Sequence, residues 1–292
     1  MELTILTPSF NREKSLCNLY HSLQKQTTKA FEWFIVDDGS TDNTRQFVDS
    51  LDADFPIRYV YKENGGKHTA LNLGIRNIQT ELTFIVDSDD TLTEDAVETV
   101  LRYHSKYAGA ADICGYVFLR KFPDGKINGA PFRTDELIGS YLDVRINSND
   151  YLADKAEVFL TSCLREFPFP EYPGERFLGE DIVWMRMSRR YRMVHINQAI
   201  YVGDYQGDGL TRNRRAQNIH APLGCMNRAK EFMEKDVTAK LRVRGALQYI
   251  VYGRFAGCSI PELVQNTKHK GLVIPLLPAG LALYADWKRK YQ

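Results

Sequence analysis

Short apolar runs alternate with longer amphipathic stretches up to residue 107, and this alternation limits the fold more than any other feature of the chain. The apolar runs have the length of strands, and each is followed by a stretch with the apolar spacing of a helix. The expected strands are 3–6, 33–36, 57–61 and 83–86, and the expected helices are 14–26, 44–50, 68–78 and 94–107. Elements in this order form βαβ units with right-handed crossovers. The sequence therefore predicts an α/β fold: a Rossmann-like, mostly parallel sheet flanked by helices.

The regular alternation ends after a fifth expected strand, at 113–119. Residues 123–150 begin with a Pro-Asp-Gly turn and have the character of an insertion. The later expected elements are strands at 156–159 and 193–205 and helices at 181–191, 221–235, 237–255 and 260–266. We therefore expect an α/β domain over residues 1–210 and a helical C-terminal module over residues 211–292.

Composition narrows the class of protein. A chain of 292 residues can bury a full core, and its 38 Lys and Arg nearly balance its 37 Asp and Glu. Because these charges nearly cancel, the protein has no overall positive electrostatic field to attract nucleic acid, and we expect no nucleic-acid partner. Five cysteines lie far apart without a CxxC pair, which favours reduced thiols in a cytoplasmic protein. Strand-like sequence from Glu2 onward leaves no room for a signal peptide, and no apolar run is long enough to span a membrane.

Residues 271–284 are apolar but contain Pro275 and Pro278, and a Trp-Lys-Arg-Lys segment follows at 287–290. One interpretation is a helix that packs on the main domain, and the helical C-terminal module as a whole could support a dimer. The other is an interfacial anchor at the cytoplasmic face of the plasma membrane, because apolar residues beside Trp, Lys and Arg suit a headgroup boundary. The two prolines weaken a single continuous amphipathic helix. Both interpretations remain open at this point.

Two carboxylates, Asp87 and Asp89, follow the expected strand at 83–86 directly. Open α/β sheets bind ligands at the carboxyl ends of their strands. Two acids one residue apart at such an edge repel each other unless a cation lies between them. A divalent metal ion that carries a diphosphate fits this position, because hard cations prefer oxygen ligands. The alternative is that these acids cap the next helix, and we assign that role to Asp90 alone.

Similar polar segments end the other expected strands. They are Thr7-Pro8-Ser9-Phe10-Asn11-Arg12, Asp37-Asp38-Gly39-Ser40, Glu63-Asn64-Gly65-Gly66-Lys67, Asp87-Ser88-Asp89 and Glu180-Asp181. In this order and spacing they resemble the family 2 glycosyltransferases, inverting enzymes of the GT-A fold, over roughly the first 210 residues. The C-terminal module is similar, much less specifically, to bacterial members that build capsule, exopolysaccharide or wall polymers.

The resemblance implies roles for the strand-end residues. Asp89 would bind Mn²⁺ or Mg²⁺, and Asp87, with Ser88 beside it, would reach the donor sugar or ribose and contribute to the metal site. Asp38 would accept the imide N–H of uracil, with Asp37 as structural support. The backbone of the loop Thr7-Pro8-Ser9 would flank the base. For Asp38 the alternative is an ordinary βα turn capped by Asp42.

Gly66 and Lys67 open the expected helix at 68–78, where glycine permits close backbone approach and lysine adds a point charge near phosphate or base. The spacing matches neither a P-loop nor a dinucleotide-binding fingerprint. Alone, the segment is equally typical of a glycine turn beside a solvated lysine. The position relative to the other segments favours a contact with the donor.

By resemblance, Asp181 would be the general base that takes the proton of the acceptor hydroxyl, and Glu180 would assist it. Simple capping of the helix at 181–191 is the alternative. Arg212, in the glycine-containing loop 205–215, would clamp the diphosphate, although a solvated surface loop explains it equally well. We do not assign a metal to His195, because a lone histidine in apolar company is more often a core residue.

These observations together predict a metal-dependent inverting glycosyltransferase. It would move a sugar from a nucleoside diphosphate donor, a UDP-sugar, to a hydroxyl of a glycan or lipid-linked glycan in bacterial surface polysaccharide synthesis. A nucleotidyltransferase is a second candidate, but the loop 7–12 lacks the glycines expected after the first strand of that class. A non-catalytic module that binds nucleotide sugars is a third.

Overall fold

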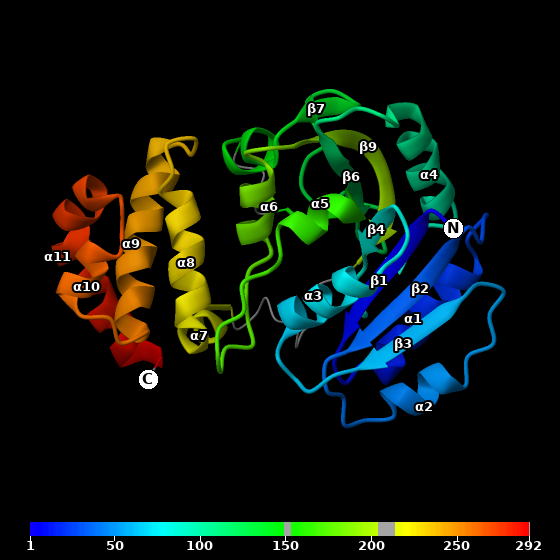
Figure 1. Ribbon diagram of the computed structural model, residues 1–292, viewed down its shortest axis with the longest axis horizontal. Helices are drawn as coiled ribbons and strands as arrows, with labels where there is room; N and C mark the ends of the chain where they lie inside the picture. Colours follow the sequence, from blue (N-terminus) through cyan, green and yellow to red (C-terminus); the bar gives the residue numbers. More distant parts are fainter. Residues whose placement is uncertain (149–152, 204–213, 292) are drawn as a thin grey trace. The chain divides into compact units, whose positions relative to one another are not determined.

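The computed structural model describes residues 1–148, 153–203 and 214–291 (Figure 1). The chain forms two compact units: Met1–Phe169 with Met187–Asp204, and Pro170–Arg186 with Tyr205–Gln292. The boundary expected near residue 210 lies outside the described residues. The second unit also includes the segment 170–186, which the sequence assigns to the α/β domain.

The described part of the first unit contains one mixed sheet with strand order β3-β2-β1-β4-β8-β6-β9-β5, and β7 pairs with β9. The strands are β1 (Leu3–Ser9), β2 (Phe31–Asp37), β3 (Ile57–Tyr61), β4 (Leu82–Ile85), β5 (Thr91–Leu92), β6 (Ile113–Lys121), β7 (Leu137–Gly139), β8 (Lys155–Leu160) and β9 (Arg192–Val202). The first four strands pair in parallel, whereas β8 runs antiparallel to both β4 and β6. The α/β fold expected from the sequence is confirmed.

Helices cover both faces of this sheet. They are α1 (Glu13–Gln24), α2 (Thr44–Asp49), α3 (Lys67–Asn77), α4 (Ala96–Tyr107) and α5 (Thr161–Glu166), with a π-helical turn at Leu142–Ile146. Leu3 and Ile5 of β1 join the core formed with α1 and α4. Leu6 points the other way, against Gly74 of α3, as the alternation of side chains along a strand requires. A Cβ at position 74 would overlap Leu6, so glycine lets α3 lie close to the sheet.

The second unit is helical. Its helices are α6 (Asp181–Met187), α7 (Arg214–His220), α8 (Pro222–Phe232), α9 (Ala239–Phe255), α10 (Ile260–Gln265) and α11 (Lys270–Tyr291). Met187, the last residue of α6, is counted with the first unit. Buried residues of α8 and α9 form the centre of its core, and Val273 of α11 joins them. The expected helical C-terminal module is confirmed, and α6 ends four residues earlier than the sequence pattern indicates.

The helix α11 continues through both prolines, which the sequence analysis expects to weaken it. Pro275 and Pro278 lie on its exposed side, so the carbonyl groups that lose a partner are not sealed in the core. Among the described helices, none is both long and apolar enough to cross a bilayer.

Candidate functional site

The carboxyl ends of β1, β2 and β4 lie side by side and bring the predicted segments together. Ser9 at the end of β1 pairs in register with Asp37 at the end of β2, and the N–H of Asp38 donates to the Ser9 carbonyl at 2.7 Å. On the other side of β1, the N–H of Val86 donates to the carbonyl of Leu6 at 3.0 Å. The segments 7–9, 37–38 and 87–89 therefore share one edge of the sheet.

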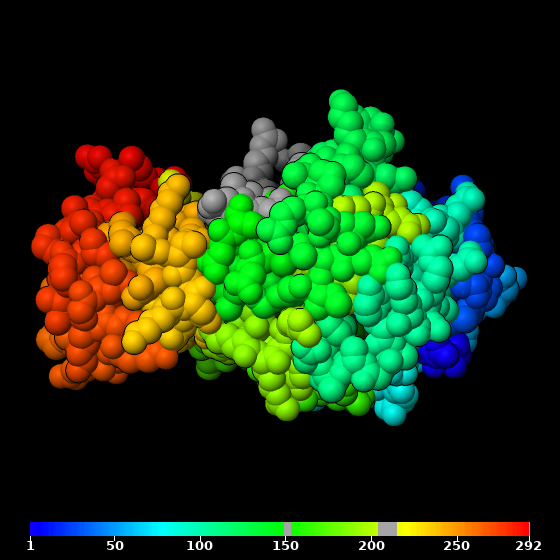
Figure 2. All heavy atoms as spheres, turned by 90° about the horizontal axis from the view of Figure 1, so that it is seen from above, coloured from blue at the N-terminus to red at the C-terminus, as the bar shows by residue number. Residues whose placement is uncertain are grey.

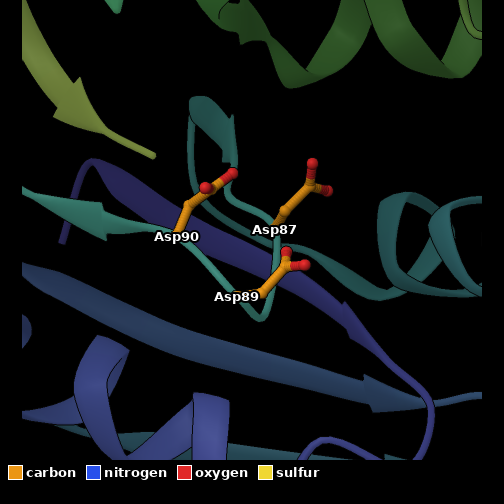
Figure 3. Close-up of side chains that lie close together, drawn as sticks. All are labelled: Asp87, Asp89 and Asp90. Atoms are coloured by element: carbon orange, nitrogen blue, oxygen red, sulfur yellow. The ribbon is translucent and has the colours of Figure 1, made fainter. Parts of the chain in front are cut away.

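Asp87, Asp89 and Asp90 form an acidic cluster on the loop after β4 (Figure 3). Each offers a carboxylate oxygen within 4.8 Å of the others, and no second group of this kind occurs in the ranges that the structure describes. Asp87 and Asp89 are partly exposed, whereas Asp90 is buried. A site with two accessible acids and one buried acid can offer hard oxygen ligands to Mn²⁺ or Mg²⁺.

Cationic side chains balance the cluster. Lys67 Nζ lies 2.5 Å from Asp87 Oδ1, and Arg12 lies 3.9 Å from Asp89. Burial works against ionisation of Asp87, but the charge and hydrogen bond of Lys67 outweigh it and lower the pKa of Asp87. Lys67 therefore lies at the same sheet edge as the acids, and its contact with the donor stays a prediction.

Asp90 does not cap a helix, and that prediction is wrong. The residue before α4 is Asp95, whereas Asp90 accepts from Arg120 at 2.8 Å and from the Tyr201 hydroxyl at 2.8 Å. Burial raises the pKa of Asp90 to about 7, although the charge of Arg120 opposes this. A Cβ at Gly203 would overlap both Arg120 and Asp90, so this pair requires glycine there.

Tyr201 connects this buried group to the acidic loop. Its hydroxyl donates to Asp90 and accepts the backbone N–H of Asp87 at 3.0 Å. The Arg120 guanidinium lies 4.8 Å from the centre of the Tyr201 ring. Asp90, Arg120 and Tyr201 therefore hold the loop that carries Asp87 and Asp89, and the sequence analysis does not identify this role for any of them.

Asp38 makes several contacts within the protein. Its carboxylate accepts the N–H groups of Gly65 at 2.9 Å and Gly66 at 2.7 Å and pairs with Lys62 at 2.6 Å. It thereby fixes the glycine turn at the start of α3, where Gly66 has φ +96°. The carboxylate of Asp37 accepts from Ser40 N–H and the Tyr59 hydroxyl, as a structural residue would. A uracil imide N–H could donate only to a carboxylate lone pair of Asp38 that Gly65, Gly66 and Lys62 do not use.

The loop Thr7-Pro8-Ser9 offers one unsatisfied group. Thr7 Oγ1 accepts from the Trp33 indole at 3.0 Å, and proline has no N–H to donate. Ser9 Oγ is buried and has no hydrogen-bond partner among the described residues. Buried hydroxyl groups are normally hydrogen-bonded, so Ser9 is a candidate ligand contact. Ser88 is buried between the two metal candidates.

Asp181 and Glu180 belong to the second unit, at the start of α6. The Asp181 carboxylate forms a two-pronged ion pair with Arg228 of α8: Arg228 Nε donates to Oδ1 at 2.6 Å, and a terminal nitrogen donates to Oδ2. Both side chains are about one-fifth exposed, at 18% for Asp181 and 19% for Arg228. The Asp181 carboxylate is therefore held in one orientation and stays partly accessible, and its role as base stays a prediction.

Two further contacts join α8 to residues 170–186 of the same unit. Glu175 accepts the N–H groups of Leu223 and Gly224 at 2.6 and 2.8 Å, and Arg186 pairs with Glu231 at 2.8 Å. The sequence analysis does not identify Arg228 or Glu175, because only the fold brings them to this segment. Arg212 lies outside the described residues.

His195 is a core residue of β9, as the sequence analysis favours. Its Nδ1 lies 3.0 Å from the Leu137 carbonyl, its ring packs on Phe132 and it is fully buried. Burial lowers the pKa of His195 to about 4, so the folded protein holds a neutral imidazole. Nothing in the described ranges groups it with the acidic cluster.

This burial predicts a pH dependence of stability. The pKa of His195 rises from about 4 in the folded chain to 6.5 on unfolding, so the unfolded state binds more protons between these values. We expect the free energy of unfolding to fall by about 2 kcal/mol from this residue as pH drops from about 7 to about 5. Urea unfolding of His195→Gln should lack this part of the pH dependence, and the exposed-site control His21→Gln should retain it. Equal pH dependence in both variants would contradict the prediction.

Residues 4–150 match the family model described as glycosyl transferase family 2, which is half of the chain, and the chain belongs to this family. One similar protein is the GalNAc(5)-diNAcBac-PP-undecaprenol beta-1,3-glucosyltransferase of Campylobacter jejuni. The two sequences are 26% identical over an alignment that covers 78% of this chain and 73% of that protein. It also matches two glycosyltransferases of Rickettsia felis and Rickettsia conorii, of whose length it spans 17%.

Solved structures show the same fold. Staphylococcus aureus TarS 1–349 in complex with UDP-GlcNAc has a TM-score of 0.66 at 19% identity, covering 100% of this chain and 93% of that one. The mannosyltransferase PcManGT of Pyrobaculum calidifontis, in complex with GDP-Man and Mn²⁺, has a TM-score of 0.57 at 16% identity. The match covers 99% of this chain and 83% of that one. The GT-A-like fold with a helical C-terminal region is thereby confirmed.

Proposed function

We propose that this chain is an inverting, metal-dependent glycosyltransferase that moves a sugar from a UDP-sugar to a hydroxyl of a glycan or lipid-linked glycan. The observation that carries the proposal is the acidic cluster after β4, which lies at the same sheet edge as Lys67 and the unpartnered Ser9 hydroxyl. Two solved proteins of the same fold are named as complexes with a nucleotide sugar, UDP-GlcNAc in one and GDP-Man with Mn²⁺ in the other, which supports a donor of this class.

The donor set fits a divalent cation. Asp87 and Asp89 present partly exposed carboxylates on one loop, and Asp90 is committed to Arg120 and Tyr201. Mn²⁺ or Mg²⁺ held by Asp87 and Asp89 would neutralise the charge that develops on the departing diphosphate. Lys67 supplies a further positive charge beside Asp87, and Ser88 lies between the two ligands.

The remaining strand ends would hold the nucleoside. Ser9 Oγ offers a free hydroxyl, and the backbone of Thr7 and Pro8 continues along the same edge. Asp38 fixes the turn at Gly66 and would accept the uracil imide with a remaining lone pair. Backbone and side-chain groups held in this way distinguish a base without moving when it binds.

In the proposed reaction Asp181 accepts the proton of the acceptor hydroxyl as that oxygen forms a bond to C1 of the sugar. The bond between C1 and the diphosphate oxygen breaks, its electron pair leaves with UDP, and the configuration at C1 inverts. Glu180 lies next to Asp181 and would assist by orienting the acceptor. The ion pair with Arg228 keeps the Asp181 carboxylate in one orientation, and each of its oxygens retains a second lone pair for the proton.

Arg228 is therefore expected to act on turnover through Asp181. Arg228→Ala should lower kcat about 10- to 100-fold, because a misoriented base costs rate in this range, and should leave the KM for the donor unchanged. Arg228→Lys should recover part of the loss. Arg186→Ala removes a neighbouring contact between α6 and α8 and serves as the control. An equal loss of kcat in the control would show that the effect is structural.

Tyr201 is expected to act on the metal. Tyr201→Phe deletes the hydroxyl that contacts Asp90 and the backbone of Asp87, and should weaken Mn²⁺ binding about 10-fold, as loss of an outer contact to a metal ligand usually does. Titration of Mn²⁺ in the presence of UDP, followed by calorimetry, measures this. Tyr116→Phe removes another buried tyrosine hydroxyl, which contacts His104, and should leave Mn²⁺ binding unchanged. Unchanged binding in Tyr201→Phe would contradict the assignment.

The acceptor class is proposed from a relative and the location from the cysteines. The Campylobacter relative is named for a lipid-linked oligosaccharide acceptor, and we propose an acceptor of that chemical class in bacterial surface polymer synthesis. The five cysteines are all free, which fits a reducing compartment, so we place the reaction in the cytoplasm.

Thermal shift with nucleoside diphosphates, each with and without Mn²⁺, tests the donor assignment. We expect UDP to raise the Tm more than GDP, CDP or ADP, and Mn²⁺ to enlarge the UDP shift. Stabilisation by none of them, or a UDP shift indifferent to the metal, would contradict the proposed site. Product analysis by NMR with the preferred UDP-sugar then reports the anomeric configuration.

A further inference from the structure

The outward side of α11 is apolar, contrary to the usual pattern of a surface helix. Between residues 272 and 287 its exposed residues are Ile274, Pro275, Pro278, Ala279, Ala282 and Ala285, and none carries a charge. Ile274 is 48% exposed. The space-filling view shows α10 and α11, in orange to red, at the surface of the second unit (Figure 2). We call these six exposed residues the α11 stripe.

The stripe is not needed to attach α11 to its own unit. The opposite side of the helix packs on the core of the unit, with Val273 buried and Leu277 and Leu281 partly buried against it. Gly280 lets α11 approach α9 closely, because a Cβ there would lie 2.7 Å from Ile250. Trp287 also turns inward, against Tyr252, so it is not the headgroup anchor that its sequence position suggests.

Positive charge flanks the stripe at both ends. Lys268 and Lys270 precede it and Lys288, Arg289 and Lys290 follow it, all exposed, whereas Asp286 is the one acid from residue 267 to residue 291. Lys268 pairs with Glu234 at 2.7 Å, so Lys270 supplies the excess positive charge at the start of the helix. Asp286 pairs with Lys290 at 2.8 Å and Arg289 at 3.2 Å, which leaves excess positive charge at the end of the helix.

This charge distribution decides between two occupants. In a symmetric dimer through the α11 stripe, the basic ends of one copy would meet the basic ends of the other, in either orientation of the two helices, and repel. An anionic surface attracts both ends at once. Apolar residues between basic residues are typical of helices that lie in the plane of a membrane interface.

We propose that the α11 stripe contacts an anionic lipid surface, with α11 lying along the interface. Alanine and proline side chains are small and bury little area, so the apolar contact alone is weak and the basic ends provide the second attraction. Binding therefore requires anionic lipid and weakens with salt. This inference concerns a different surface from the donor site and does not depend on the proposed transferase activity.

Flotation of the full chain with phosphatidylcholine vesicles, with and without phosphatidylglycerol, tests the proposal. We expect flotation only with phosphatidylglycerol, and loss of flotation at high salt. The double variant Ala279→Glu/Ala282→Glu changes exposed residues only, and should bind at least about 10-fold less, because each new charge faces both the apolar layer and the anionic lipid. Lys288→Gln/Lys290→Gln should also bind about 10-fold less.

Ile138→Glu, at a 40% exposed residue of β7, adds one negative charge outside the stripe and is the control for the sign of the added charge. Far-UV circular dichroism and Tm confirm that each variant is folded. No flotation of the wild-type chain, or equal flotation of the stripe variant and the control, overturns the proposal. A wild-type dimer that the two glutamates dissociate in size-exclusion chromatography would identify a second copy as the occupant and also overturn it.

Discussion

An Asp181→Asn enzyme is expected to bind UDP as tightly as the wild-type chain does and to transfer sugar about 10²- to 10⁴-fold more slowly. Asparagine has nearly the shape of aspartate but cannot accept the proton of the acceptor hydroxyl. The donor contacts proposed for Ser9, Asp38 and the acidic cluster are all in the first unit, whereas Asp181 belongs to the second. Donor affinity and turnover should therefore separate, which calorimetry with UDP and a steady-state transfer assay measure.

Two controls make this result specific. Asp236→Asn removes an exposed carboxylate in the same unit and should change neither quantity. Asp181→Asn/Arg228→Ala should lose little more than Asp181→Asn alone, because Arg228 is proposed to act through the carboxylate that is already gone. Retained transfer in Asp181→Asn would remove Asp181 from the role of base, and additive losses would give Arg228 an independent role.

The meeting of the polar segments at one edge of the sheet could be predicted from the sequence because the segments follow strands. A parallel sheet brings the carboxyl ends of neighbouring strands to one edge, so polar residues just after β1, β2 and β4 meet whatever the details of packing. The position of Lys67 at this edge also follows, since Lys67 begins the helix after β3. Local pattern and topology are sufficient for these residues.

The residues that support the site could not be predicted in this way. Tyr201 contacts Asp90 across 111 positions of the chain, and Arg228 contacts Asp181 across 47. Neither contact has a periodicity or a spacing that a sequence pattern can report. Asp90 shows the resulting error: a local rule assigns it to a helix cap, but burial beside Arg120 gives it a different role.

The two prolines of α11 show the opposite case. A local rule predicts an interrupted helix, yet packing of Val273, Leu277 and Gly280 on one side stabilises a continuous one. Helices in proteins owe most of their stability to such packing and less to propensity. The solvent-exposed position of Pro275 and Pro278 is what lets packing prevail, and it can be known only from the structure.

Replacing Asp89 with asparagine is expected to remove metal-dependent donor binding and to lower kcat/KM about 10²- to 10⁴-fold, since the metal ion contributes several kcal/mol of charge stabilisation. Asp89 is the partly exposed acid of the cluster whose cationic neighbour, Arg12, is farthest away, at 3.9 Å. By contrast, Asp87 is held by Lys67 at 2.5 Å and Asp90 by Arg120 at 2.8 Å. Asp89 is therefore the acid best able to bind a metal without breaking an ion pair.

The measurement is the increase in the UDP thermal shift when Mn²⁺ is added. This increase should be absent in Asp89→Asn. In the wild-type chain, EDTA should abolish it and renewed addition of Mn²⁺ should restore it. Asp95→Asn, six residues further along the chain and exposed, is the matched control and should keep the full metal response. Asp87→Asn removes the carboxylate that pairs with Lys67 and should also lose the metal response. A normal metal response in Asp89→Asn would place the cation elsewhere and contradict the assignment of Asp89.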